Sequence, residues 1–208
     1  MLASRLVDRY RGSVCAVVAL DDGGAIVGAE IAQQLGVPIS MLVSEEIYLP
    51  LEPLAVGGMA PDGQFVYNPQ YSQADIQDLE EENRGYIEAQ KINKYRDINQ
   101  IISSHGVIDR KTLTGQNIIL VSDGLPNTFK LDVALSFLKT VNYQRLIVAT
   151  PLAAVSVVDW MHIHADEICC LSVLEDYSDT NHYYDVQDVP DHDTLMSALN
   201  TKLITTAS

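Results

Sequence analysis

The stretch Val14-Cys-Ala-Val-Val-Ala-Leu-Asp-Asp-Gly-Gly24 decides the fold class. Its first part, Val14 to Leu20, is continuously apolar and rich in valine, which is typical of a strand buried on both faces of a parallel sheet. The run breaks at Asp21, and apolar residues then recur at helical spacing from Ala25 to Leu35. A second strand is expected over Ile39–Val43. Since parallel strands need a crossover connection, this unit predicts a right-handed βαβ crossover.

The same alternation returns in the second half of the chain. We expect strands over Asn117–Val121, Arg145–Thr150 and Glu167–Val173, separated by helices over Thr128–Thr140 and Ala153–Met161. This order predicts an α/β fold with a doubly wound, mainly parallel sheet flanked by helices. The length of 208 residues is that of one ordinary domain, so we predict a single domain over residues 1–208.

An insertion separates the two halves. Gly57, Gly58, Pro61 and Gly63 are interpreted as turn residues, and residues 53–72 are predicted to form a small hairpin arm. Residues 74–102 carry apolar side chains along one stripe, which predicts a long amphipathic helix. Residues 175–208 are predicted to form a C-terminal hood that ends in a helix.

Composition narrows the classes of partner. The 13 Lys and Arg residues stand against 28 Asp and Glu residues, and the formal net charge is −15. Such a surface repels phosphate backbones and anionic lipids, so we expect neither nucleic acid nor membrane as a partner. No signal-peptide block or membrane span is recognised, and the three cysteines lie in apolar runs without a disulfide pattern. These features predict a cytoplasmic protein.

Polar residues follow three of the expected strands. They are Asp21–Gly24, Ser44–Ile47 and Ser122–Thr128. In open parallel sheets, ligands collect outside the carboxyl ends of the strands. The third run combines an acid, a glycine and a small polar loop that opens a helix, an arrangement that directs backbone N–H groups at an anion.

The third run and its strand, Ile118-Ile-Leu-Val-Ser-Asp-Gly-Leu-Pro-Asn-Thr128, resemble the signature with which type I phosphoribosyltransferases bind phosphoribosyl pyrophosphate (PRPP). Further landmarks of a predicted phosphoribosyltransferase subgroup stand in the same order, and the resemblance covers most of Leu6 to Leu199. These landmarks are Leu20-Asp-Asp-Gly-Gly24, Val43-Ser-Glu-Glu46, Tyr95-Arg96, Ala165–Leu171 and Tyr183-Tyr184.

The resemblance implies where a ligand would bind. In that family an acid pair holds the ribose hydroxyls, the following loop wraps the 5′-phosphate, and basic residues with Mg²⁺ hold the pyrophosphate. The ribose and phosphate positions here are Asp123, Gly124, Asn127, Thr128 and Lys130; the pyrophosphate-loop positions are Asp21, Asp22, Gly23 and Gly24; the second strand-end positions are Glu45 and Glu46. With Asn127 as helix N-cap, Lys130 is the third helical residue, and it either holds an anion or is an exposed lysine.

The chain departs from the family pattern at its charged positions. Ser122 stands where the first acid is expected, and Pro126 lacks an N–H donor. Asp22, Glu45 and Glu46 stand where basic residues are expected. Each reversal exchanges attraction for repulsion of roughly 4 kcal/mol for unit charges 4 Å apart at an effective dielectric constant of about 20. We therefore predict that PRPP transfer has been lost.

The acidic positions suggest a second kind of site. If Asp21, Asp22, Glu45, Glu46 and Asp123 converge, their oxygens suit a hard cation such as Mg²⁺ or Ca²⁺. Alternatively, the loops extend these side chains into water, or the acids bind a cationic ligand or a basic patch on a partner protein.

Three functions stay open from the sequence, and no catalytic residue is assigned. The first is a phosphoribosyltransferase-like binding, regulatory or interaction module that binds a small phosphate-containing ligand or a protein. The second is an active, Mg²⁺-dependent phosphoribosyltransferase of altered specificity on a nucleobase. The third is a structural subunit that packs through the helix over residues 74–102 and the acidic loops, with a homodimer as one form.

Overall fold

The computed structural model describes residues 1–52, 54–105, 108–177, 180–185, 189–192, 194–195 and 197. The chain forms two compact units. Unit 1 comprises Met1–Leu42, Ile108–Thr128 and the described residues from Val141 onward, and unit 2 comprises Val43–Val107 and Phe129–Thr140. The single domain over residues 1–208 stays a prediction. Among the described residues, no helix has both the length and the apolar character needed to cross a membrane.

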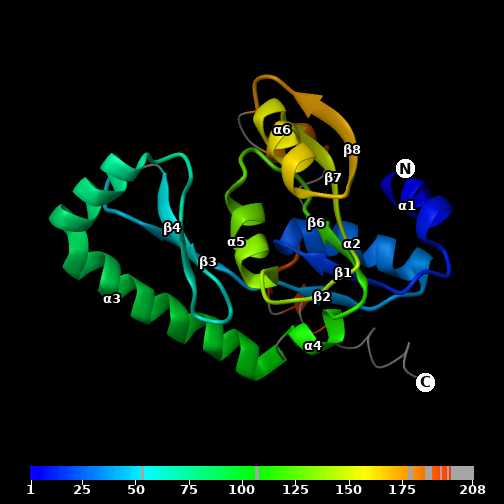
Figure 1. The fold of residues 1–208 in the computed structure, drawn as a ribbon, viewed down its shortest axis with the longest axis horizontal. Helices are drawn as coiled ribbons and strands as arrows, with labels where there is room; N and C mark the ends of the chain where they lie inside the picture. The colour runs from blue at the N-terminus through cyan, green and yellow to red at the C-terminus, as the bar shows by residue number, and fades with distance from the viewer. Residues whose placement is uncertain are drawn as a thin grey trace. The chain divides into compact units, whose positions relative to one another are not determined.

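Unit 1 is built on a parallel sheet (Figure 1). Its strands are β1 (Cys15–Ala19), β2 (Ile39–Met41), β6 (Asn117–Val121), β7 (Arg145–Ala154) and β8 (Glu167–Leu174), in the order β2-β1-β6-β7-β8. Every pair in this sheet is parallel. All residues of β1 and β6 are buried, as their continuous apolar runs predict. The predicted mainly parallel α/β sheet is confirmed.

Helices cover this sheet. They are α1 (Leu2–Tyr10), α2 (Asp22–Leu35), the short α4 (Arg110–Leu113) and α6 (Val155–His164), followed by the 3₁₀ turn η1 (Thr180–Tyr183). Alternate strand residues such as Val17, Ile119 and Ile147 form one core cluster with apolar side chains of α1 and α2, so these two helices lie on the same face of the sheet.

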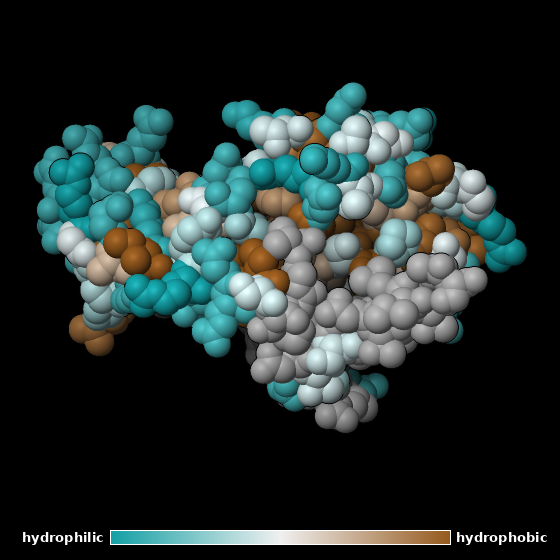
Figure 2. All heavy atoms as spheres, turned by 90° about the horizontal axis from the view of Figure 1, so that it is seen from below, coloured by the Kyte–Doolittle hydropathy of each residue, from teal (hydrophilic) through white to brown (hydrophobic). Residues whose placement is uncertain are grey.

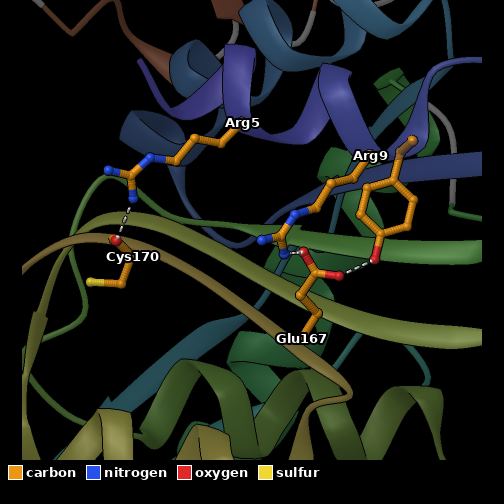
Figure 3. Close-up of polar contacts among 5 residues, drawn as sticks. Arg5, Arg9, Glu167 and Cys170 are labelled. Carbon is orange, nitrogen blue, oxygen red and sulfur yellow. Dashed lines mark hydrogen bonds and ion pairs between the residues drawn. The ribbon is translucent and has the colours of Figure 1, made fainter.

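Helix α1 was not anticipated from the sequence. Its apolar side is buried, and its polar flank is fixed to the edge strand β8 (Figure 3). The Arg9 guanidinium pairs with Glu167, Tyr10 donates to the same carboxylate at 2.6 Å, and Arg5 donates to the Cys170 carbonyl at 3.4 Å. The last contact covers part of an exposed strand edge, a place that proteins protect against pairing with other chains.

Unit 2 contains a three-stranded antiparallel sheet. Its strands are β3 (Glu45–Tyr48), β4 (Ala55–Met59) and β5 (Phe65–Tyr67), in that order, with α3 (Gln73–His105) and α5 (Phe129–Leu138) in the same unit. The segment expected as a hairpin arm therefore pairs with a further strand. The interpretation of Gly57 and Gly58 as turn residues was wrong, because both lie inside the fully buried strand β4.

Helix α3 is amphipathic along only part of the expected stripe. Ile87 and Ile98 are fully buried in separate core clusters with residues of the sheet, whereas Tyr86 and Tyr95, which belong to the expected stripe, are 40% and 41% exposed. On the face seen in Figure 2, hydrophilic residues cover most of unit 2, and hydrophobic residues stand separately among them. The predicted hood and helix over residues 175–208 lie largely outside the described residues.

Candidate functional site

The sheet register brings two polar loops together at the carboxyl ends of β1 and β6. Ala19 pairs with Val121 at the end of the two strands, and the backbone N–H of Leu20 donates to the Val121 carbonyl at 2.9 Å. Ser122 follows Val121 directly and Asp21 follows Leu20, and the hydrogen bond between their side chains shows that the two residues lie close together. This is the place at which an open parallel sheet binds ligands.

Asp21 connects the two loops. It is the N-cap of α2, since its Oδ1 accepts a hydrogen bond from the Gly24 N–H at 2.6 Å. Its Oδ2 accepts from the Ser122 hydroxyl at 2.8 Å, and Ser122 is completely buried. A carboxylate at a helix N-terminus is stabilised by the unpaired N–H groups and the helix dipole. The anion position of α2 thus holds a carboxylate of the chain itself.

The glycine pair Gly23-Gly24 allows this close approach. A Cβ atom at Gly23 would lie 2.0 Å from the Asp123 Oδ2, so the Asp123 carboxylate lies directly against the Gly23 backbone. A Cβ at Gly24 would lie 2.5 Å from the Val121 carbonyl oxygen and 2.7 Å from the Asp21 Oδ1. The open backbone of these glycines faces carboxylates where the family resemblance predicts pyrophosphate.

Backbone donors in the loop after β6 are already engaged. The Gly124 N–H donates to the Ser122 Oγ at 3.3 Å, and the Leu125 N–H donates to the Leu152 carbonyl at 3.0 Å. Pro126 follows and has no N–H. The Leu125 bond belongs to a parallel bridge with Ala153, which explains why β7 continues beyond the predicted end at Thr150. Three successive residues of the loop therefore supply no open N–H for an anion.

Three residues of the C-terminal region also contact these loops, and the sequence did not predict their roles. The Tyr184 hydroxyl donates to the Asp123 carbonyl at 2.7 Å, and the Tyr177 hydroxyl lies where a Cβ at Gly124 would be. His192 Nδ1 lies 2.7 Å from the Asp22 Oδ1. Burial, followed by the nearby Asp123 charge, raises the pKa of Tyr184 to about 12. The gathering of Tyr and His residues after β8 is the signal that could have found this contact.

Comparison with known proteins identifies sequence relatives and a solved structure of the same fold. No protein-family model matches the chain. Two curated Mycobacterium tuberculosis proteins, named "Putative phosphoribosyl transferase MT0597" and "Putative phosphoribosyl transferase Rv0571c", are each 28% identical to it over 177 residues. The match covers 82% of this chain and 38% of the relatives. The chain thus spans about two fifths of the length of the curated relatives it matches.

A solved structure shows the same fold. The crystal structure of TT1426 from Thermus thermophilus superposes with a TM-score of 0.70 and 21% sequence identity, and covers 96% of this chain and 93% of that chain. In sequence the chain is similar to these two putative phosphoribosyl transferases, and in fold it is similar to TT1426.

The remaining predicted ligand positions are divided between the units. Asn127 and Thr128 are half-buried in unit 1, whereas Lys130 belongs to unit 2. The expected N-cap at Asn127 was wrong by one residue, because α5 begins at Phe129 and Lys130 is its second residue. The helix starts later than the sequence suggested because the loop first follows β7 through Leu125.

Glu45 and Glu46 were expected in a loop after the second strand, and this expectation was wrong. Both lie in β3 and pair with β4. Glu45 forms an ion pair with Lys94 at 2.8 Å, and Glu46 accepts a hydrogen bond from Tyr48. Within the described ranges, no group of three or more His, Cys, Asp or Glu side chains is arranged to hold a metal ion. A cation site that joins Glu45 and Glu46 to Asp21, Asp22 and Asp123 stays a prediction.

A cavity of about 380 Å³ lies elsewhere in unit 1, between α1 and the start of β8. Its charged lining residues are Arg5, Arg9, Asp8 and Glu167, so positive and negative charges balance. Glu167 is engaged by both Arg9 and Tyr10. We assign no ligand to this cavity.

Proposed function

We propose that this phosphoribosyltransferase-like protein has lost PRPP transfer and acts as a binding or regulatory module for a small ligand with a single phosphate, such as a ribose 5-phosphate group. The position of Asp21 carries the proposal. Its carboxylate accepts from the Gly24 N–H at the start of α2, where an anionic ligand group would otherwise accept. Asp22, beside it, adds a second carboxylate at the same loop.

Electrostatics favours a ligand without pyrophosphate. PRPP transfer requires stabilisation of a multiply charged leaving group, and the loop offers carboxylates instead of cations. PRPP and Mg²⁺ therefore do not fit the first loop as this chain builds it. The second loop retains Asp123 as an acceptor for sugar hydroxyls and the polar side chains of Asn127 and Thr128 for one phosphate. We also propose a cytoplasmic location, which the three free cysteines support.

The test combines turnover and binding. Purified protein is incubated with PRPP, Mg²⁺ and a mixture of purine and pyrimidine bases, and pyrophosphate release is measured. We expect no release above background. In calorimetric titrations with ribose 5-phosphate, we expect binding that Asp123→Ala removes, whereas Asp62→Ala in the turn before β5 leaves it unchanged. Base-dependent pyrophosphate release would contradict the proposal.

An active, Mg²⁺-dependent phosphoribosyltransferase acting on a nucleobase is the second candidate, and the names of the curated relatives support it. A structural subunit or homodimer is the third, supported by exposed apolar side chains of α3 such as Ile92. The release assay addresses the second candidate. Sedimentation over a hundredfold range of protein concentration addresses the third, because a dimer shows a mass that rises with concentration.

A further inference from the structure

We propose that the described residues from Asp176 to His192, here named the C-terminal strap, form an autoinhibitory contact that closes the candidate site. The inference rests on the proposed function, because it concerns how a ligand reaches that same site. It is carried by separate contacts from one segment to both loops of the site.

The first contact covers Asp123. The Tyr184 hydroxyl donates to the Asp123 carbonyl at 2.7 Å. The nearby charges of Asp123 and Asp21 both raise the pKa of this phenol. A sugar hydroxyl that binds Asp123 must approach the space beside this ring. Ligand and Tyr184 therefore compete for the neighbourhood of one residue.

The second contact covers Gly124. A Cβ atom at this position would lie 2.0 Å from the Tyr177 Oη and 2.8 Å from the Thr180 Cγ2. The Tyr177 hydroxyl is also hydrogen-bonded to the Thr180 Oγ1 at 2.9 Å. The strap is thus in direct contact with the loop backbone, and the contact requires a residue without a side chain at position 124.

The third contact covers the first loop. His192 Nδ1 lies 2.7 Å from the Asp22 Oδ1, and both side chains are partly exposed. Among the described residues, the His192 Nε2 is buried and has no hydrogen-bond partner. An unsatisfied buried nitrogen opposes the closed arrangement. The strap is therefore held by several contacts but carries a feature that favours opening.

These contacts make ligand binding and strap closure reciprocal. A ligand that needs Asp123 uncovered binds only the fraction of molecules in which the strap is open, and its affinity is reduced by that fraction. Weakening the strap therefore tightens ligand binding. A strap that instead completed the site would act in the opposite direction, and this difference makes the proposal testable.

The test uses Tyr184→Phe, which removes the hydroxyl that donates to Asp123. Tyr183→Phe is the matched control, because the Tyr183 hydroxyl donates to the Asp176 carbonyl at 3.1 Å within the strap itself. Amide hydrogen exchange of the strap reports opening, and titration with ribose 5-phosphate reports affinity. Loss of one hydrogen bond corresponds to about a two- to tenfold change in equilibrium. We expect faster exchange and ribose 5-phosphate affinity tighter by this factor in Tyr184→Phe, and neither change in Tyr183→Phe.

A second variant removes the contact with Gly124. Tyr177→Ala deletes the hydroxyl that lies against Gly124 and is expected to open the strap with both loops of the site unchanged. If the wild type binds ribose 5-phosphate and an opened variant binds it no more tightly, autoinhibition is overturned and the proposed function stands. Absence of ribose 5-phosphate binding in every variant, with the strap open by exchange, would overturn both the proposed function and the inhibitory role.

Discussion

Two Gly-Gly pairs in this chain have the same sequence but opposite surroundings. Gly23-Gly24 lies beneath the carboxylates of Asp123 and Asp21, whereas Gly57-Gly58 lies beneath aromatic rings. A Cβ at Gly57 would be 2.2 Å from the Phe65 ring, and one at Gly58 would be 2.8 Å from the Phe129 ring. In both places the absence of a side chain allows a close approach.

The comparison teaches what such a pair indicates. It predicts that something approaches the backbone, but the approaching group is decided by elements far away in the sequence. At Gly23-Gly24 the neighbours are Asp21 of the same loop together with the end of β6 and the loop after it, about a hundred residues later, and they are mainly polar. At Gly57-Gly58 they come from β5 and α5, and apart from the Val66 carbonyl oxygen they are apolar side chains. A substitution at each position therefore tests a different chemistry.

Gly24→Ala is expected to have the largest effect. The new methyl group would meet the Val121 carbonyl oxygen and the Ser122 Cα, which belong to the backbone of a buried strand end and cannot rotate away. We expect a loss of about 3 kcal/mol in the free energy of unfolding, measured by urea denaturation. Gly85→Ala is the control, because nothing lies within 4 Å of its Cβ position in α3, and it should stabilise by about 0.5 to 1 kcal/mol. A neutral Gly24→Ala would contradict the close approach.

Gly58→Ala is expected to have a smaller effect, because the obstacle is a side chain. The methyl group would meet the Phe129 ring at 2.8 Å and the Val133 Cγ2 at 3.1 Å. We expect a loss of about 2 kcal/mol. Adding Phe129→Leu should recover part of it, since the shorter side chain leaves room for the methyl group. Additive losses in the double variant would show that the ring is not the obstacle.

Sequence patterns predicted the parallel sheet well because a strand buried on both faces is apolar at every position. The runs at β1 and β6 are apolar throughout, and their strands were found within one or two residues. Strand β4 was not predicted because its two glycines are typical of turns. Helix α1 was not predicted because its nine residues are too few for a clear helical pattern of apolar and charged residues.

The candidate site could be predicted only in part. The positions of Asp21 and Asp123 follow from strand ends, and the strand ends follow from the apolar runs. The hydrogen bond between Asp21 and Ser122 joins two loops about a hundred residues apart, and a single sequence does not show that these two side chains meet. The contacts of Tyr184 and His192 depend on the chain returning to the loops after β8, which local patterns do not reveal.

Gly23→Ala tests whether the other glycine of the polar pair also lies against a neighbouring group. Its obstacle is the Asp123 carboxylate, a side chain that can rotate, so we expect a stability loss of about 1 kcal/mol. Asp123→Ala should remove the obstacle, and the double variant should then be no less stable than Asp123→Ala alone. A double-mutant cycle by urea denaturation measures this coupling. Independent effects of the two substitutions would mean that the carboxylate does not lie against Gly23.

The smallest expected effect is a difference between the two glycine pairs in how stability depends on pH, because the rings that a Cβ would meet at the apolar pair are phenylalanines. The folded state holds the pKa of Tyr184 at about 12, above its ordinary value of 10.0, through burial and the Asp123 charge. Below pH 10 the phenol is protonated in both states, and its stabilising contribution is fully present. Between pH 10 and 12 the unfolded chain ionises first, so the free energy of unfolding falls. Tyr184→Phe should make this fall shallower than in Tyr183→Phe, measured by urea denaturation at several pH values.

Phe65 and Phe129 do not ionise, so substitution of either ring should leave the slope unchanged. Equal slopes in the two tyrosine variants would mean that Tyr184 is not buried beside Asp123.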